Sequence, residues 1–342
     1  MASTGIGGCF FTNWSFEMAR KKVGGHPTGD LVAATVSAAF PGTLVVNQSE
    51  VCSLWAGYGS IYRVRLSSGV SAIVKHITPP HDSSSISNVR KVRSYEVEGY
   101  FYANLTGDVA AIPRLPRPYS IVSADNSFCF VLEDLSVEFP KMFHSLGGPT
   151  LRAALTWLAQ FHATFWNCDD GGVADDGGYW YLATRQDEYD ALGGEDLSVK
   201  LRAHAAWIDQ KTRDPRYETL LHGDAKSANM LWRDETTCAW VDFQYVGRGL
   251  GAKDVAYLLC SSGNRSEVAN KADDLLRWYF GEFESAMMLA GHDSRGYTFD
   301  QFQGHFDWCL LDYVRFMAGW GFWGNYEWAI QRTKSLLTEL QC

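Results

Sequence analysis

The sequence lacks the patterns that mark zinc-binding, secreted and membrane proteins. Its eight cysteines stand singly, without a CxxC pair or a spacing typical of zinc ligands. No stretch is apolar over enough residues to cross a membrane, and the N-terminal MASTGIGGCFFTNWSF has no basic segment before a long apolar run. We therefore expect a cytoplasmic protein with reduced thiols and no membrane partner.

Positive charge is also scarce. The chain has 30 Lys and Arg against 39 Asp and Glu, which gives a formal net charge of -9. Nucleic-acid binding needs a basic surface that displaces counterions, so no nucleic-acid partner is expected. A neutral or cationic small molecule suits this balance better, although a mild acidic excess also simply aids solubility.

The order of the hydrophobic patterns predicts an α+β fold in two lobes. A chain of 342 residues exceeds the usual size of a single core. Residues 1 to about 40 are expected to form a polar entry with a short helix. Short β-branched runs separated by turn residues then predict five strands and one helix before residue 135, and apolar residues at helical spacing predict a mainly helical remainder. The expected lobes are 1–134 and 135–342. The strands are expected at 44–54, 60–66, 71–77, 119–123 and 128–135, with the helix at 88–105, and the second lobe is expected to hold short strands at 219–221 and 238–243 and helices near 151–165, 254–260, 270–289, 302–317 and 328–340.

The segment LLHGDAKSANMLW carries the clearest chemical signal. Asp224 precedes Asn229 by five residues, and Asp242 follows at the end of the apolar run AWVD. Phosphoryl transfer needs an oriented hydroxyl, magnesium on the phosphates and an in-line geometry. Asp224 would accept or orient the hydroxyl proton, while the oxygens of Asn229 and Asp242 would coordinate magnesium.

The motif HGDxxxxN, followed by a strand that ends in Asp, resembles the phosphotransferase motif of the aminoglycoside phosphotransferase and choline kinase-like families. The segments DFQ, EDL, LAQFHATFW and GLGAKDVAYLL resemble most the branch that contains the ecdysteroid kinase-like proteins. This resemblance covers about residues 55–259 and implies a bilobal protein-kinase-like fold. It also implies ATP and Mg as cofactors, a nucleotide-binding first lobe, a catalytic second lobe and a small-molecule hydroxyl acceptor.

Three further residues of the second lobe gain expected roles from the resemblance. Lys226 has the spacing of the catalytic-loop lysine of serine/threonine kinases and would meet the transferring phosphoryl oxygens, although it also fits an exposed loop lysine. Asp254 resembles the family aspartate that braces the catalytic loop. His222 is expected to orient this loop, since the neighbouring carboxylate already serves as the base.

In the first lobe, Lys75 would reach the α and β phosphates of ATP. Its partner is Glu96 or Glu98, and the family habit of a glutamate shortly before an aromatic pair favours Glu98. A nucleotide-covering loop and a hinge complete the expected ATP site, although AGYGSIY departs from GxGxxG at Tyr62 and also fits an ordinary hairpin turn. The loop residues are Gly57, Tyr58, Gly59 and Ser60, and the hinge residues are Glu133 and Leu135.

Aromatic residues gather between positions 308 and 328, where Trp320 and Trp323 stand near Asp312. Such a cluster packs a core or lines an acceptor pocket. Glycines within it weaken a helix, which favours a loop with accessible indoles. A choline-like amino alcohol would use the aromatic faces and Asp312, and a flat apolar or sugar-like alcohol would use the same surface. The sequence does not separate these acceptors.

Two rival functions remain. A protein-kinase function is not favoured, because no APE segment or activation loop for a protein substrate follows DFQ. A pseudokinase scaffold usually loses a catalytic residue, yet Lys75, Asp224, Asn229 and Asp242 are all present. The sequence makes no prediction of oligomeric state.

Overall fold

A computed structural model describes residues 28–54, 57–80, 86–107, 113–124 and 127–339. The N-terminal stretch considered above for targeting signals lies outside them. The chain divides into two compact units. The first takes the residues up to Gly107 together with Pro116–Val137, and the second takes 108–115 together with Glu138–Cys342. The first unit thus extends a few residues past the expected end at 134.

The first unit is built on a five-stranded antiparallel sheet in the order β1-β2-β3-β5-β4. All five predicted strands and the predicted helix are present, and a further helix precedes them. The elements are α1 (Thr28–Ala39), β1 (Val45–Ser53), β2 (Gly59–Leu66), β3 (Ser71–Ile77), α2 (Ile86–Asn104), β4 (Pro118–Ala124) and β5 (Ser127–Glu133).

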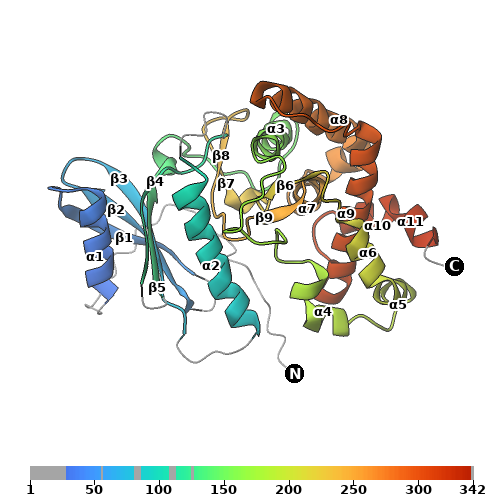
Figure 1. Ribbon diagram of the computed structural model, residues 1–342, viewed down its shortest axis with the longest axis horizontal. Coiled ribbons are helices and arrows are strands. Elements are labelled where there is room, and N and C mark those ends of the chain that lie inside the picture. The colour runs from blue at the N-terminus through green and yellow to red at the C-terminus, as the bar shows by residue number, and fades with distance from the viewer. Residues whose placement is uncertain (1–27, 55–56, 81–85, 108–112, 125–126, 340–342) are drawn as a thin grey trace. The chain divides into compact units, whose positions relative to one another are not determined.

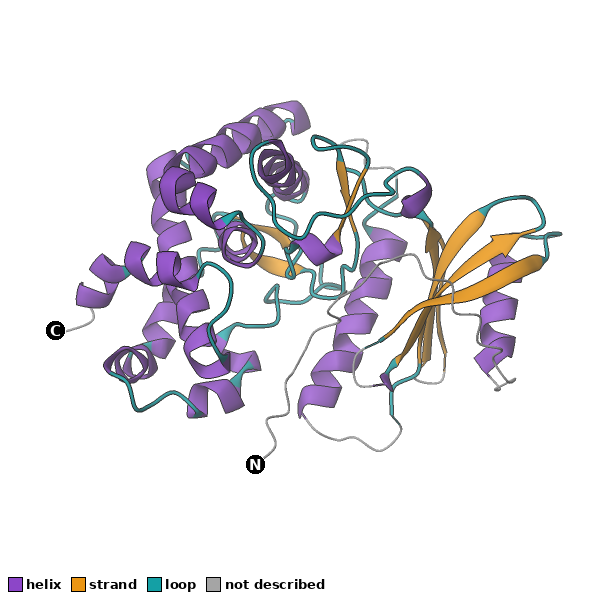
Figure 2. Cartoon of the chain, turned by 180° about the vertical axis from the view of Figure 1, so that it is seen from behind, coloured by secondary structure: helices purple, strands orange, loops and turns teal. Residues whose placement is uncertain are grey.

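Alternation along β5 directs its side chains to opposite faces of this sheet. Val131 joins the apolar cluster formed with Val36 of α1, whereas Phe130 meets α2, where a Cβ at Gly99 would lie 3.1 Å from its ring. Figures 1 and 2 show α1 and α2 on the two sides of the sheet. The sheet is therefore covered by one helix on each face.

The second unit is mainly helical and carries two short antiparallel strand pairs, β6-β9 and β7-β8. Its helices are α3 (Pro149–Thr164), α4 (Gln186–Asp190), α5 (Asp196–Ala203), α6 (Ala205–Lys211), α7 (Ala252–Ser261), α8 (Arg265–Ala290), α9 (Phe299–Trp320), α10 (Tyr326–Arg332) and α11 (Lys334–Glu339), and its strands are β6 (Glu218–Leu221), β7 (Met230–Trp232), β8 (Cys238–Trp240) and β9 (Gly247–Leu250). The predicted α+β class is confirmed.

Several boundaries in the second unit differ from expectation. The helix expected at 328–340 is two helices, α10 and α11, and the strand expected at 238–243 ends at Trp240. Short elements with weak periodicity, α4 to α6, β7 and β9, were not predicted. Within the part of the chain that is described, no helix is long and apolar enough to cross a membrane, and no disulfide links the cysteines.

The core of the second unit centres on α3, which packs against α8. Its buried face includes Leu155, which is fully buried, and Trp157, whose ring stacks on Trp240 at 4.9 Å between centroids. The predicted amphipathic helix is thus the centre of a largely aromatic core.

We expect Leu155→Ala to lower the free energy of unfolding by about 2–5 kcal/mol, since it removes buried methyl groups and leaves a cavity. Leu289→Ala serves as the matched control, because Leu289 is 89% exposed and should change stability by less than about 0.5 kcal/mol. Urea denaturation followed by circular dichroism measures both. Equal effects of the two changes would contradict this view of the core.

Candidate active site

The carboxylate of Asp224 lies in the loop that follows β6 and is held on both oxygens. Its Oδ2 accepts hydrogen bonds from Lys226 Nζ at 2.8 Å and from Asn229 Nδ2 at 3.0 Å. Its Oδ1 accepts one from the Tyr257 hydroxyl at 3.2 Å. A carboxylate with both oxygens held in this way has one orientation.

Asp254 fixes the backbone that carries Asp224. From the first turn of α7, its carboxylate accepts hydrogen bonds from the backbone amides of His222 at 2.6 Å and Gly223 at 3.0 Å. His162 on α3 contacts the same carboxylate at 3.2 Å, and its other ring nitrogen meets the Tyr279 hydroxyl at 2.7 Å. The bracing that the resemblance implied for Asp254 is present as these bonds.

His222 links the catalytic loop to the strand that leads to Asp242. Its Nδ1 accepts from the Asp224 amide at 3.3 Å, so Nε2 carries the proton and donates to the Val241 carbonyl at 3.1 Å. Burial lowers the pKa of His222 despite the carboxylate of Asp254 nearby. The neutral ring therefore has both nitrogens occupied, which suits an orienting role.

Asn229 and Asp242 present the oxygens that a magnesium ion would need. The Asn229 amide nitrogen is used by Asp224, which leaves the amide oxygen for a cation. Asp242 has a φ of 67°, a strained value for a residue other than glycine. No cluster of three His, Cys, Asp or Glu side chains suited to a metal occurs among the described residues. An amide and one carboxylate, completed by phosphate oxygens and water, fit magnesium nonetheless.

Lys226 is a fixed cation rather than a mobile surface lysine. Burial opposes its charge, but the Asp224 carboxylate overcomes this effect and raises the pKa of the ammonium above its ordinary value. The side chain as a whole keeps 26% exposure. It stands where it would meet an anion that approaches Asp224.

In the first unit, Lys75 on β3 pairs with Glu98 on α2. The Nζ atom lies 2.7 Å and 3.0 Å from the two carboxylate oxygens, and both side chains are buried. Glu96, the alternative partner, is exposed and meets Arg93 at 3.0 Å. The choice between the two glutamates is thereby settled in favour of Glu98.

The glycine-containing turn before β2 has the backbone of a tight loop. Gly57 and Gly59 have φ values of 75° and 132°, and a Cβ at Gly59 would lie 2.1 Å from the His76 carbonyl oxygen. Tyr58 is buried, with its hydroxyl bonded to Asn88. Ser60 donates to a carboxylate on β1 at 2.9 Å.

The expected hinge lies at the end of β5. Glu133 is half-buried, and its Oε2 accepts a hydrogen bond from the Arg117 amide at 3.1 Å. Leu135 starts a short 3-10 helix and is buried. Asp134 between them is paired with Arg63 at 2.8 Å.

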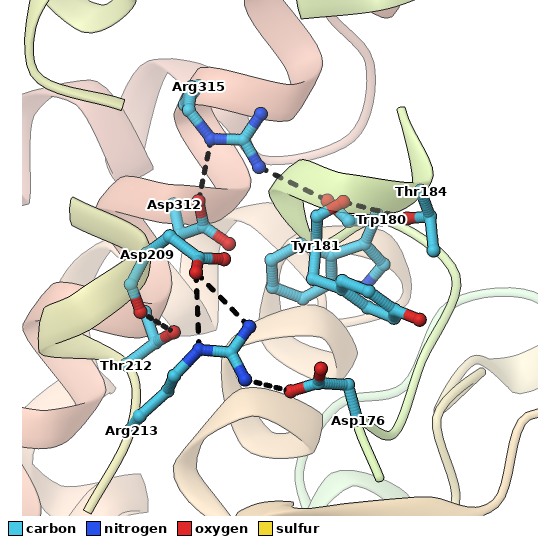
Figure 3. A network of polar contacts seen from close by, with 9 residues as sticks. All are labelled: Asp176, Trp180, Tyr181, Thr184, Asp209, Thr212, Arg213, Asp312 and Arg315. Carbon is cyan, nitrogen blue, oxygen red and sulfur yellow. Dashed lines mark hydrogen bonds and ion pairs between the residues drawn. The ribbon is translucent and has the colours of Figure 1, made fainter. Parts of the chain in front are cut away.

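The three residues expected at the acceptor have different surroundings. Asp312 is fully buried, and its Oδ1 accepts from Arg315 Nε at 2.7 Å, as Figure 3 shows. Its carboxylate is thus not presented to an amine at the surface. Trp320 is the last residue of α9 and is half-buried, whereas Trp323 follows the helix and is 36% exposed.

A group of tyrosines near Asp224 was not predicted from the sequence. The Tyr257 hydroxyl that contacts Asp224 also meets the Tyr179 hydroxyl at 2.8 Å, and the Tyr245 ring lies 5.1 Å from that of Tyr179. Burial, followed by the nearby Asp224 carboxylate, raises the pKa of Tyr179 to about 12 and that of Tyr245 likewise to about 12. All three hydroxyls are therefore neutral hydrogen-bonding groups near pH 7; the pKa of Tyr257 is raised well above its ordinary value, mainly by burial.

Tyr179 is delivered by the Gly/Asp-rich loop CDDGGVADDGG, which packs backbone to backbone on the catalytic loop. Gly178 donates to the Tyr245 carbonyl at 2.9 Å. Gly223 has a φ of 79°, and a Cβ there would lie 2.1 Å from the Tyr245 oxygen and 2.8 Å from the Gly178 nitrogen. The glycines of CDDGGVADDGG were the feature of the sequence that could have indicated this close approach.

We expect Gly223→Ala to destabilise the protein by more than about 3 kcal/mol, because strain at positive φ adds to a clash with backbone. Gly291→Ala is the control: Gly291 has a φ of 70° but nothing within 4 Å of its Cβ position, so only about 1–2 kcal/mol should be lost. Urea denaturation compares the two variants. Similar losses would show that the close approach at Gly223 does not matter.

Comparisons with known proteins give distant structural likenesses and one family. No curated protein matches the sequence significantly. The chain is similar to a solved aminoglycoside phosphotransferase from Alicyclobacillus acidocaldarius (16% identity, 94% of this chain and 97% of that one, TM-score 0.47) and to choline kinase from Streptococcus pneumoniae (11%, 91% and 98%, TM-score 0.45). The model of the phosphotransferase enzyme family matches residues 53–289, more than half of the sequence. The chain therefore belongs to the phosphotransferase enzyme family, as its motifs predicted.

Proposed function

We propose that this phosphotransferase moves the γ-phosphoryl group of ATP, with magnesium, to a hydroxyl group of a small molecule. The observation that carries the proposal is the Asp224 carboxylate, held by Lys226, Asn229 and the Tyr257 hydroxyl. A carboxylate with both oxygens oriented suits a base that accepts the proton of an attacking hydroxyl. The Lys226 ammonium, 2.8 Å from the Asp224 carboxylate, suits the negative charge of the transferring phosphoryl group.

The roles of the remaining residues follow from their chemistry. The oxygens of Asn229 and Asp242 would hold magnesium, which when bound neutralises phosphate charge. Lys75, kept in place by Glu98, would contact the α and β phosphates. The turn at Gly57, Tyr58, Gly59 and Ser60 and the backbone of Glu133 and Leu135 would contact the nucleotide.

We expect Asp224→Asn to lower ADP release in the presence of magnesium, ATP and an accepted alcohol by about 10²–10⁴-fold, because the amide keeps the shape of the side chain but cannot take the proton. The acceptor panel would hold amino alcohols, sugars and lipophilic ring alcohols. Asp274→Asn on the exposed side of α8 is the matched control and should retain full activity. Undiminished turnover in Asp224→Asn would remove the proposed base, and ATP binding without turnover on any acceptor would favour the scaffold reading.

We expect Asp242→Asn to raise the magnesium concentration needed for half-maximal activity, since one anionic oxygen ligand is lost. A magnesium titration of ADP release measures this shift, and chelation should abolish wild-type turnover reversibly. Asp234→Asn in the β7-β8 turn is the control, because that carboxylate accepts hydrogen bonds within its own turn, from Thr236 among others. An unchanged magnesium requirement in Asp242→Asn would contradict the assigned ligand.

A further inference from the structure

A guanidinium group lies over three aromatic rings, one of which, Tyr179, is linked through Tyr257 to Asp224. The Arg185 side chain lies over the rings of Tyr179 at 5.1 Å, Trp320 at 4.8 Å and Phe316 at 5.7 Å. Its Nε donates to the Tyr179 carbonyl at 2.7 Å, and Nη1 meets Glu188 at 3.4 Å. The Arg185 guanidinium therefore makes cation–π contacts with three rings at once.

Close helix packing fixes the place of this guanidinium. Arg185 directly precedes α4, and its carbonyl accepts from the Tyr189 amide at 2.9 Å. A Cβ at Gly319, within α9, would lie 2.1 Å from the Glu188 carbonyl oxygen. The glycine expected to weaken α9 instead lies within the helix and lets α4 approach it. Arg185 is thus held by backbone packing as well as by its rings.

One of the covered rings, that of Tyr179, is connected to the Asp224 carboxylate through two hydroxyls. Tyr179 bonds Tyr257 at 2.8 Å, and Tyr257 bonds Asp224 at 3.2 Å. Tyr245 beside Tyr179 is half-buried, and Trp323 lies 6.4 Å from the Tyr257 ring. We call Tyr179, Tyr245 and Trp323 the aromatic wall. It is the partly accessible surface that an acceptor would touch with its hydroxyl at Asp224.

The charges around the aromatic wall do not favour a second cation. Aromatic faces attract ammonium groups through their quadrupoles, but here Arg185 already lies over Tyr179, the ring of the wall that is linked to Asp224. The carboxylates of Glu188 and Asp224 are each paired, with Arg185 and Lys226. A third carboxylate, that of Asp242, also acts on Tyr245, and in the proposed function it would be used by magnesium. The neutral hydroxyls of the wall add no anion. A protonated amine would therefore meet like charge and find these three acidic partners already in use.

We propose that Arg185 determines the charge preference of the acceptor site, so that an uncharged alcohol binds the aromatic wall and a protonated or quaternary amine is disfavoured. This inference rests on the proposed function and deepens it. It reverses one acceptor expectation from the sequence, in which the aromatic cluster would bind an amino alcohol.

The test compares choline with 3,3-dimethylbutan-1-ol, which has the same shape with carbon in place of the charged nitrogen. Saturation-transfer NMR titrations give the affinity of the wild-type protein for each. We expect the neutral alcohol to bind about tenfold more tightly. Tighter binding of choline would overturn the proposal. Binding of neither compound by a protein that binds ATP would also overturn it, because the aromatic wall would then not hold an alcohol.

Matched variants test whether Arg185 causes the preference for the neutral alcohol. Arg185→Met keeps an apolar side chain without charge and should shift the affinity ratio toward choline by about tenfold, whereas Arg185→Lys should keep the neutral preference. Arg202→Met is the control, because Arg202 also covers a ring, that of Tyr189 at 5.4 Å, outside the aromatic wall. An unchanged ratio in a folded Arg185→Met protein would refute the assignment.

A second variant covers the case in which Arg185→Met does not fold. Glu188→Gln removes the charge that pairs with Arg185, so the preference for the neutral alcohol should become stronger, and a shift toward choline would contradict the proposal.

Measurements of ADP release distinguish failure of the proposed role of Arg185 from failure of the proposed kinase reaction. Turnover that depends on Asp224 without any charge preference refutes the role of Arg185 alone. A charge preference with turnover indifferent to Asp224→Asn refutes the proposed kinase reaction alone.

Discussion

The position of the Asp224 carboxylate depends on the hydrogen bonds that Asp254 accepts from the loop after β6. A loop that leaves a strand has backbone amides without partners, and buried amides without partners are costly. Asp254 satisfies those of His222 and Gly223, and His162 contacts the same buried carboxylate. The loop is thereby fixed to α7 and α3, so Asp224 inherits its position from the helical core.

Glycine makes the second contact of this loop possible. Gly223 adopts a left-handed φ, and its missing side chain leaves room for the Tyr245 carbonyl and the Gly178 amide. The Gly/Asp-rich loop docks there and brings Tyr179 next to Tyr257. Asp254 holds the catalytic loop from one side, and the glycine contact brings the Tyr179 hydroxyl to Tyr257, whose own hydroxyl contacts Asp224.

Sequence patterns predicted what depends on local order and missed what depends on distant contacts. The meander was readable because alternation and turn residues act over a few positions, and HGDxxxxN keeps Asp224 and Asn229 in one loop. The burial of Asp312 was not predicted, because although its partner Arg315 lies one turn further along α9, Trp180, whose carbonyl accepts from the same guanidinium, is distant in the sequence. The prediction that glycines such as Gly319 weaken a helix was wrong for a similar reason. Gly319 lies within α9, and its missing side chain allows the close approach of α4, which is distant in the sequence.

The pairing of charges around Asp224 has a consequence for the proposed reaction. In the resting site Lys226 is neutralised by the base at 2.8 Å. When the carboxylate takes the proton of the attacking hydroxyl, its negative charge disappears and the ammonium loses its partner. At that moment negative charge develops on the transferring phosphoryl oxygens. The same lysine that holds the base in place would then be released to stabilise the transition state, without any movement of the backbone.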